Sequence, residues 1–124
     1  MKSLIRQPRR NAFIFRSSGV IDISASVARS LSISEGDVID IAEQDGELYM
    51  YIKHKRNEYT GRYIGTAKAS NNGKGTYRVY SKQMAQEVLR ISHSASKLKC
   101  PAGELVNIEG RMCITIIYRI NNEH

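Results

Sequence analysis

Residues 19–52, which read GVIDISASVARSLSISEGDVIDIAEQDGELYMYI, decide the fold of this chain. The apolar run 20–23 predicts a strand. It ends at Ser24, whose hydroxyl can accept a free backbone N–H at the start of a helix. Val27 and Leu31 then recur at helical spacing, so they share one face of a short helix. The first half of the stretch therefore predicts a strand followed by a short helix.

The second half of the same stretch predicts two further strands. Its first segment, Glu35-Gly36-Asp37, is typical of a turn, and the apolar residues of 38–41 follow it. Asp45-Gly46, placed before the alternating apolar residues of 48–52, indicates a two-residue hairpin turn. The whole stretch is therefore one unit of strand, helix, strand and strand.

A second copy of this unit follows along the chain. Its segments come in the same order, and the helix residues match at a separation of 57 positions. An ordered series of matches of this kind indicates a tandem duplication, with an extra loop over roughly 92–100 in the second copy. The matched segments are 19–24 with 75–81, Val27, Ala28 and Leu31 with Met84, Ala85 and Val88, 36–41 with 103–108, and Gly46 with Gly110.

The order of these motifs resembles the AbrB/MazE/MraZ family of swapped-hairpin β-barrels, over most of residues 11–120. Tandem members such as MraZ build the barrel from one chain. The resemblance therefore implies a mainly β fold with two short helices, an AbrB-like barrel built from two tandem β-α-β-β repeats. It also implies DNA binding. The second arginine of the family's helix pair is present as Arg29, with Ala28 beside it, and Gln86 takes the Arg29 position in the second copy.

The length of 124 residues is typical of one domain. We expect a basic arm at 1–10, a first repeat at 11–55 and a second repeat at 56–120. No stretch is apolar and long enough to span a membrane, and the N-terminus lacks the apolar core of a signal peptide. We therefore expect a cytoplasmic protein with no membrane association.

Ahead of the stretch 19–52, the residues of 12–16 alternate weakly around Phe13 and Phe15 and predict a further strand. We expect residues 59–67 to pair with it. The composition of 69–75, rich in Gly and Asn, predicts a flexible loop.

The net charge of +7 is unevenly distributed along the chain. Residues 1–16 carry five basic side chains and no acidic one, and residues 53–82 carry eight basic side chains and one acidic. Residues 17–52 carry one basic side chain and seven acidic ones. Basic segments that neutralise phosphates supply most sequence-independent affinity for DNA. We therefore expect double-stranded DNA to contact the two basic segments, and the acidic end at 36–47 to point away from it.

The predicted DNA-binding residues are Arg6, Arg9, Arg10, Arg16, Arg29, Arg62, Lys68, Lys74, Arg78 and Lys82.

Several alternatives remain open at this level. The basic segments also fit a solvated charged face that keeps a small protein in solution. A protein-interaction or antitoxin-like oligomerisation module, without direct DNA readout, competes with a transcription regulator, and a homo-oligomer fits either. Binding to DNA, if it occurs, is either sequence-specific or architectural.

Signals for catalysis are weak. The three histidines are scattered, and Cys100 and Cys113 are too far apart for a metal-binding pair or a disulfide framework. Solvation at turns and strand edges explains Asp22, Asp37 and Asp40 without a cation site. We therefore do not expect an enzyme, and we expect no catalytic residue, no metal and no cofactor. We expect Cys113, which alternates with its neighbours in a strand, to lie in the core or to be half-buried.

The periodicity also predicts which side chains form the core. They are Ile23, Val27, Leu31, Val38, Ile41, Leu48, Met84, Val88, Leu105 and Ile108.

The duplication predicts that one chain closes its sheet by pairing its two repeats, because each repeat alone would expose an apolar face. Expression of residues 1–55 alone should therefore give an aggregate or a self-dimer. The measurement is molar mass by light scattering combined with circular dichroism. A folded monomeric fragment would contradict the duplication hypothesis.

Overall fold

The computed structural model describes residues 10–58 and 67–120. The described chain is mainly β, with two α-helices. Its elements, in order, are β1 (Asn11–Arg16), β2 (Val20–Ile23), α1 (Ala25–Leu31), β3 (Val38–Gln44), β4 (Glu47–His54), the 3₁₀ helix η1 (Arg56–Glu58), β5 (Ser70–Asn71), β6 (Tyr77–Tyr80), α2 (Lys82–Ile91), β7 (Lys97–Ile108) and β8 (Arg111–Ile116).

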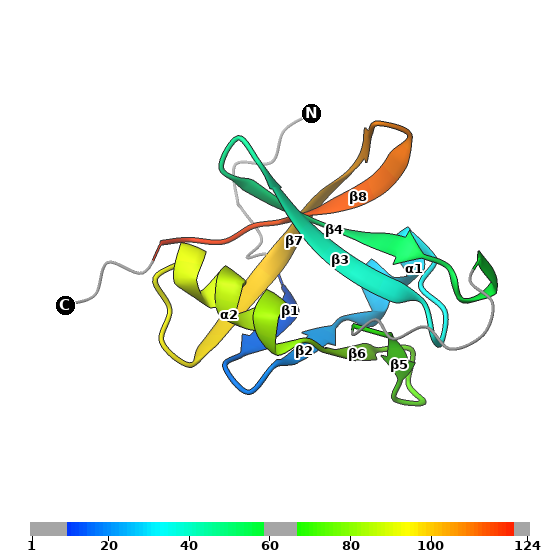
Figure 1. Ribbon diagram of the computed structural model, residues 1–124, viewed down its shortest axis with the longest axis horizontal. Helices are drawn as coiled ribbons and strands as arrows, with labels where there is room; N and C mark the ends of the chain where they lie inside the picture. The colour runs from blue at the N-terminus through cyan, green and yellow to red at the C-terminus, as the bar shows by residue number, and fades with distance from the viewer. Residues whose placement is uncertain (1–9, 59–66, 121–124) are drawn as a thin grey trace.

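The strands form one antiparallel sheet of eight strands in the order β3-β4-β8-β7-β1-β2-β6-β5 (Figure 1). The two ends of this order also meet. Val38 forms an isolated antiparallel bridge with Lys68, and the N–H of Ile39 donates to the carbonyl of Ala67 at 2.9 Å. The N–H of Ala69 donates to the carbonyl of Asp37 at 2.7 Å. The start of β3 is therefore tied to the segment that leads into β5.

The strand β1 is confirmed, but its predicted partner is wrong. β1 pairs with β2 on one side and with β7 on the other, so both of its edges are occupied. Residues 59–66, most of the predicted partner, lie outside the described part of the chain. The residues at 97–100, expected in a loop, belong to β7, because they supply the ladder opposite β1.

In two strand pairs, the paired residues of the two repeats are related by an approximate two-fold axis. In the β2–β6 pair, Ile21 lies opposite Val79 and Ile23 lies opposite Tyr77. Adding 56 to the numbers of Ile21 and Ile23 gives Tyr77 and Val79, so the two pairs are equivalent. The matched helix residues differ by 57 in number, because the segment 75–81 is one residue longer than 19–24. In the β4–β8 pair, Met50 lies opposite Ile114.

Both helices begin where the sequence predicted. The hydroxyl of Ser24 accepts from the N–H of Val27 at 3.2 Å, and the hydroxyl of Ser81 accepts from the N–H of Met84 at 3.2 Å. These hydrogen bonds satisfy backbone donors that a helix start would otherwise leave free. The two caps are counterparts in the two repeats.

The match between 36–41 and 103–108 is wrong by three residues. Ile41 lies opposite Met50 in one hairpin, and Leu105 lies opposite Ile114 in the other. Because both hairpins turn on a two-residue loop, the counterpart of Ile41 is Leu105 rather than Ile108. The similar sequences of 36–41 and 103–108, each a glycine followed by an acidic residue, therefore do not occupy equivalent positions in the two hairpins.

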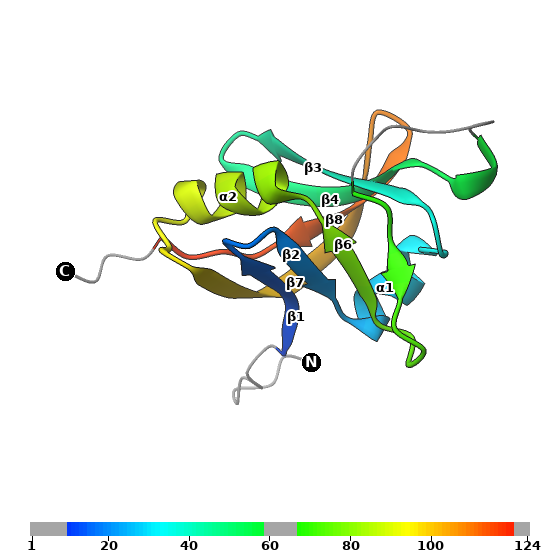
Figure 2. The same ribbon diagram turned by 60° about the horizontal axis from the view of Figure 1, so that its bottom comes forward.

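The core lies inside the curved sheet, around Phe13, Phe15 and Met50. Most of the predicted core is confirmed. Leu105 is the exception, with 41% of its surface exposed. The two helices lie on opposite sides of the molecule (Figures 1 and 2), and α1 contacts β8. Leu105, on β7, nevertheless keeps much of its surface in solvent. The predicted residues that are buried are Ile23, Val27, Leu31, Val38, Leu48 and Val88, and those partly buried are Ile41, Met84 and Ile108.

Asp37 is fully buried rather than solvated at a turn. Its Oδ2 accepts from Lys55 Nζ at 2.6 Å and from the N–H of Ser34 at 2.7 Å, and its Oδ1 accepts from the N–H of Arg56 at 2.8 Å. One carboxylate therefore ties the turn before β3 to the end of β4. The prediction that solvation explains Asp37 is wrong, because the turn folds against the β4 exit.

Replacing Asp37 with Ala should lower the free energy of unfolding by about 1–3 kcal/mol for each of the two backbone donors that lose their acceptor, while Lys55 keeps the carbonyl of Ser32. Chemical denaturation measures this loss. Glu104→Ala is the matched control, since Glu104 is exposed and should change stability by less than about 0.5 kcal/mol. Equal effects of the two substitutions would contradict the role given to Asp37.

Candidate nucleic-acid interface

The strands β7, β1, β2, β6 and β5 present a basic outer surface, which we call the basic face. Side chains alternate between the two faces of a strand. Phe13, Ile21 and Val79 point inward and are fully buried. Their neighbours along the chain therefore point outward. The residues of the basic face are Arg16, Asp22, Lys68, Arg78, Tyr80, Lys97 and Lys99.

The register arranges these side chains in two lines across the strands. In one line Lys99 lies opposite Ile14, Ile14 opposite Asp22, and Asp22 opposite Arg78. In the next line Lys97 lies opposite Arg16, and Tyr80 lies opposite Val20. The first line continues to Ser70 of β5, which lies opposite Arg78, and so crosses four strand spacings, roughly 19 Å in all. Cations from distant parts of the sequence therefore become neighbours.

Asp22 is the acidic side chain at the centre of this face. Its Oδ1 accepts from Arg78 Nε at 2.8 Å, and its Oδ2 accepts from Arg16 Nη1. Partial burial acts to raise the pKa of Asp22, but the hydrogen bonds from Arg78 and Arg16 outweigh it and hold the pKa below its ordinary value. Asp22 was expected to be merely solvated, and it is instead shared by two guanidinium groups.

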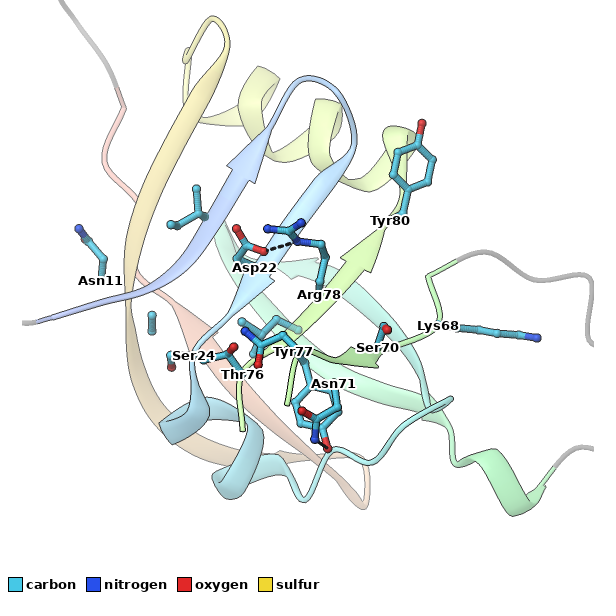
Figure 3. Close-up of a pocket in the computed structure, with 14 residues that line it drawn as sticks. Asn11, Asp22, Ser24, Lys68, Ser70, Asn71, Thr76, Tyr77, Arg78 and Tyr80 are labelled. Carbon is cyan, nitrogen blue, oxygen red and sulfur yellow. Dashed lines mark hydrogen bonds and ion pairs between the residues drawn. The ribbon is translucent and has the colours of Figure 1, made fainter. Parts of the chain in front are cut away.

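A groove of about 680 Å³ runs over the same strands. Asp22 and Arg78 lie at its centre, with Lys68 and Tyr80 toward its outer side (Figure 3). Asn11, Ser70 and Thr76 add amide and hydroxyl groups to its lining. The groove thus combines fixed cations with neutral hydrogen-bonding groups, and such groups bind phosphates and base edges.

The segment 69–75 is a tight turn rather than a loop of undefined structure. Residues of β5 pair with β6, and the Oδ1 of Asn72 accepts from the N–H of Lys74 at 2.9 Å. The Oδ1 of Asn71 accepts from the N–H of Gly73 at 2.7 Å. Asn side chains can replace backbone turn contacts in this way. Lys74 is therefore carried at the tip of a two-stranded ribbon.

The backbone of Lys82 lies against the β1–β2 turn, at the border of the basic face. Gly19 has a φ of +102°, and a Cβ there would lie 3.0 Å from the backbone N and Cα of Lys82. Only glycine fits such a conformation and such a distance. The β1–β2 turn therefore packs directly on the start of α2, beside Tyr80.

The structure brings together most of the predicted DNA-binding residues that it describes. Arg16 and Arg78 lie on the face itself, and Arg10 precedes β1. Arg29 belongs to the last turn of α1 and is not part of the groove lining. The predicted residues on or beside the basic face are Arg10, Arg16, Lys68, Lys74, Arg78 and Lys82, and those outside the described chain are Arg6, Arg9 and Arg62.

The sequence analysis missed Lys97 and Lys99. Both are exposed and lie on β7, opposite Arg16 and Ile14. The alternation of Lys97-Leu98-Lys99-Cys100 was a signal of period two that could have shown a strand with a basic outer face. It was overlooked because the polar residues before it suggested a loop.

The acidic segment 36–47 was expected to point away from the basic face, and only its tip does so. The β3–β4 turn, with Asp45, lies on the opposite side of the molecule from β2, β6 and β5 (Figure 1). The other end of the segment lies near β5, because the N–H of Gly36 donates to the carbonyl of Ala69 at 2.8 Å. β3 therefore runs from the border of the basic face to the far end.

A smaller cavity of about 270 Å³ lies on the outer side of β3, β4 and β8. The guanidinium of Arg111 stacks over the ring of Tyr51 at 4.9 Å, and the hydroxyl of Tyr51 donates to Asp40 at 2.8 Å. Cys113 lines this cavity but is almost fully buried, and burial raises the pKa of its thiol. The groups here already satisfy one another.

Both cysteines are free and buried. Burial raises the pKa of Cys100 to about 12, so its thiol stays protonated and unreactive near neutral pH. The expected buried position of Cys113 is confirmed. Across residues 10–58 and 67–120 there is no group of three or more His, Cys, Asp or Glu side chains placed to hold a metal ion.

Comparisons with protein-family models, curated proteins and solved structures gave no match for this chain. Among the described residues, none of the helices has the length and apolar character needed to cross a membrane.

The position of Asp22 predicts a pH dependence of stability. Its pKa in the folded protein lies below the ordinary value of 3.8. The carboxylate therefore stabilises the fold above that value, and the contribution is lost as the pH falls through the lowered pKa. In thermal unfolding from pH 6 to pH 2.5, the wild-type melting temperature should fall more steeply in the acid range than that of Asp22→Asn. Parallel curves would contradict the ion pairs.

Proposed function

We propose that this protein binds double-stranded DNA through the basic face and acts as a transcription regulator. The observation that carries the proposal is the gathering of cations around Asp22: Arg16, Arg78, Lys97 and Lys99 on adjoining strands and Lys68 on the segment that leads into β5. These cations come from four separate parts of the chain. A face used only for solvation has no need to bring them together.

Phosphate neutralisation is the physical basis of this proposal. Each cation that meets a phosphate releases condensed counterions, which makes binding favourable and dependent on salt. The acidic turn at Asp45 lies on the far side (Figure 1), so it does not repel a duplex laid on the basic face. The groove adds hydroxyl and amide donors within the same area.

We also propose that the curved sheet is a swapped-hairpin barrel of the AbrB type. Three contacts support this proposal. The β3–β4 hairpin of the first repeat pairs with β8 of the second, β1 of the first repeat pairs with β7 of the second, and β3 is bonded to the segment before β5. Each half of the chain thus completes the sheet of the other.

The affinity of a 20-base-pair duplex at several salt concentrations tests the proposal. In Lys97→Ala/Lys99→Ala, affinity should fall for all sequences. The slope of log K against log salt should flatten by about 0.9 for each phosphate that the variant no longer neutralises. The control is Lys53→Ala/Arg111→Ala, which removes two cations from the outer side of β4 and β8 and should leave affinity and slope unchanged. If both double variants bind like the wild type, the basic face is a solvated surface.

A second function, protein interaction, is favoured by a different surface. Leu105 is 41% exposed and Met112 is 44% exposed on the β7–β8 hairpin. Large apolar side chains that stand together in solvent often mark an interaction site. Under this alternative Met112→Lys should lower the molar mass measured by light scattering, and the wild type should not bind duplex DNA.

A further inference from the structure

Asp22 weakens the electrostatic attraction between the basic face and DNA of any sequence. A carboxylate at the centre of a phosphate-binding face repels the ligand and reduces the local positive potential. It also engages Arg16 and Arg78, the two arginines nearest to it. Sequence-independent attraction would be stronger with a neutral residue at this position.

The same ion pairs fix the orientation of Arg78. Arg78 is largely exposed, with 62% of its side-chain surface accessible, so it would otherwise sample many rotamers. Asp22 accepts from its Nε at 2.8 Å. Within the described part of the chain, Nε is the only guanidinium nitrogen of Arg78 that donates to a protein acceptor. The planar fork of its two terminal nitrogens remains available to a ligand.

Arg78 lies on β6, between Ser70 of β5 and Asp22 of β2. Beyond Arg78, β5 and β6 continue into the two-stranded turn at 72–76. The major groove of DNA admits a two-stranded ribbon, and a guanidinium at the base of such a ribbon can donate two parallel hydrogen bonds to O6 and N7 of guanine. A guanidinium already held in place loses less side-chain freedom on binding. Its planar fork also distinguishes guanine from other bases, which a freely rotating lysine does poorly.

We propose that Asp22 positions Arg78 to read a guanine in the major groove, so that Asp22 determines specificity and the protein binds defined sites. This inference rests on the proposed function, duplex binding through the basic face. It goes further by choosing sequence-specific recognition over architectural binding and by naming the base. Arg16 is held by the other oxygen of the same carboxylate and keeps that carboxylate ionised and oriented.

The test is selection from a pool of random 20-base-pair duplexes, followed by affinity measurements on the selected site and on the unselected pool. The wild type should enrich a motif with at least one fixed guanine. Changing that guanine should weaken wild-type binding by about 5- to 150-fold. Asp22→Asn should bind the unselected pool at least as tightly as the wild type, but should lose most of the preference for that guanine.

Arg78→Lys separates positioning from charge. It should keep the salt dependence of the wild type and lose the guanine preference, because charge is retained and the planar fork is not. Asp40→Asn is the control, since Asp40 bonds to Tyr51 on another surface, and it should select the wild-type motif. Circular dichroism on each variant establishes that it is folded.

The outcomes distinguish the two proposals. If the wild type binds the pool with the expected salt dependence but enriches no motif, or if Asp22→Asn and Arg78→Lys keep the full guanine preference, the inference is overturned and DNA binding stands. If the wild type binds no duplex at low salt, the proposed function fails and the inference fails with it.

Discussion

The antiparallel pairing of β2 with β6 is the contact on which the rest of this structure depends. It joins the two repeats, and it brings Ile21 and Val79 together in the core. On the outer side the same register brings Asp22 next to Arg78. Because side chains alternate along a strand, a slip of β6 by one residue against β2 would place its apolar side chains outside and its charged ones inside. The register of this one strand pair thus fixes both the core and the basic face.

The two-fold relation between the repeats is incomplete in ways that matter for function. α1 spans seven residues and α2 spans ten. Leu48, beside the first hairpin turn, is buried, whereas Met112, its counterpart beside the second, is 44% exposed. Charge is unequal as well, since Arg78, the counterpart of Asp22 in the second repeat, carries the opposite charge and lies directly across from it. A duplex on the basic face would therefore meet different side chains from the two repeats.

Asp37 anchors the region where the ends of the strand order meet. Its side chain binds Lys55 and the N–H of Arg56, and its carbonyl accepts from Ala69. The carboxylate has partners for both oxygens, and a buried charge requires them. The contacts hold the exit of β4 and the approach to β5 on either side of β3. The border of the basic face thus depends on a residue that contributes nothing to its charge.

The sequence was sufficient for features that depend on neighbouring residues. The strand at 20–23, the Ser24 cap, the Asp45-Gly46 turn and the inward side chains of β2 all follow from spacing within a few positions. Features that depend on distant partners were missed. β1 was given the wrong neighbour, since its ladder with β7 joins residues more than eighty positions apart. Asp22 and Asp37 were interpreted as solvated, because Arg78 and Lys55 become their partners only after folding.

The central claim is that duplex DNA binds on the outer side of the strands from β7 to β5. The most direct test is a titration of ¹⁵N-labelled protein with a short duplex, followed through amide chemical shifts. The claim predicts the largest shifts in β2, in β6, in the turn at 72–76 and at the start of β7, and unchanged amides at Asp45 and Gly46. Shifts confined to the β7–β8 hairpin around Leu105 and Met112, or no shifts at a saturating concentration of duplex in low salt, would contradict it.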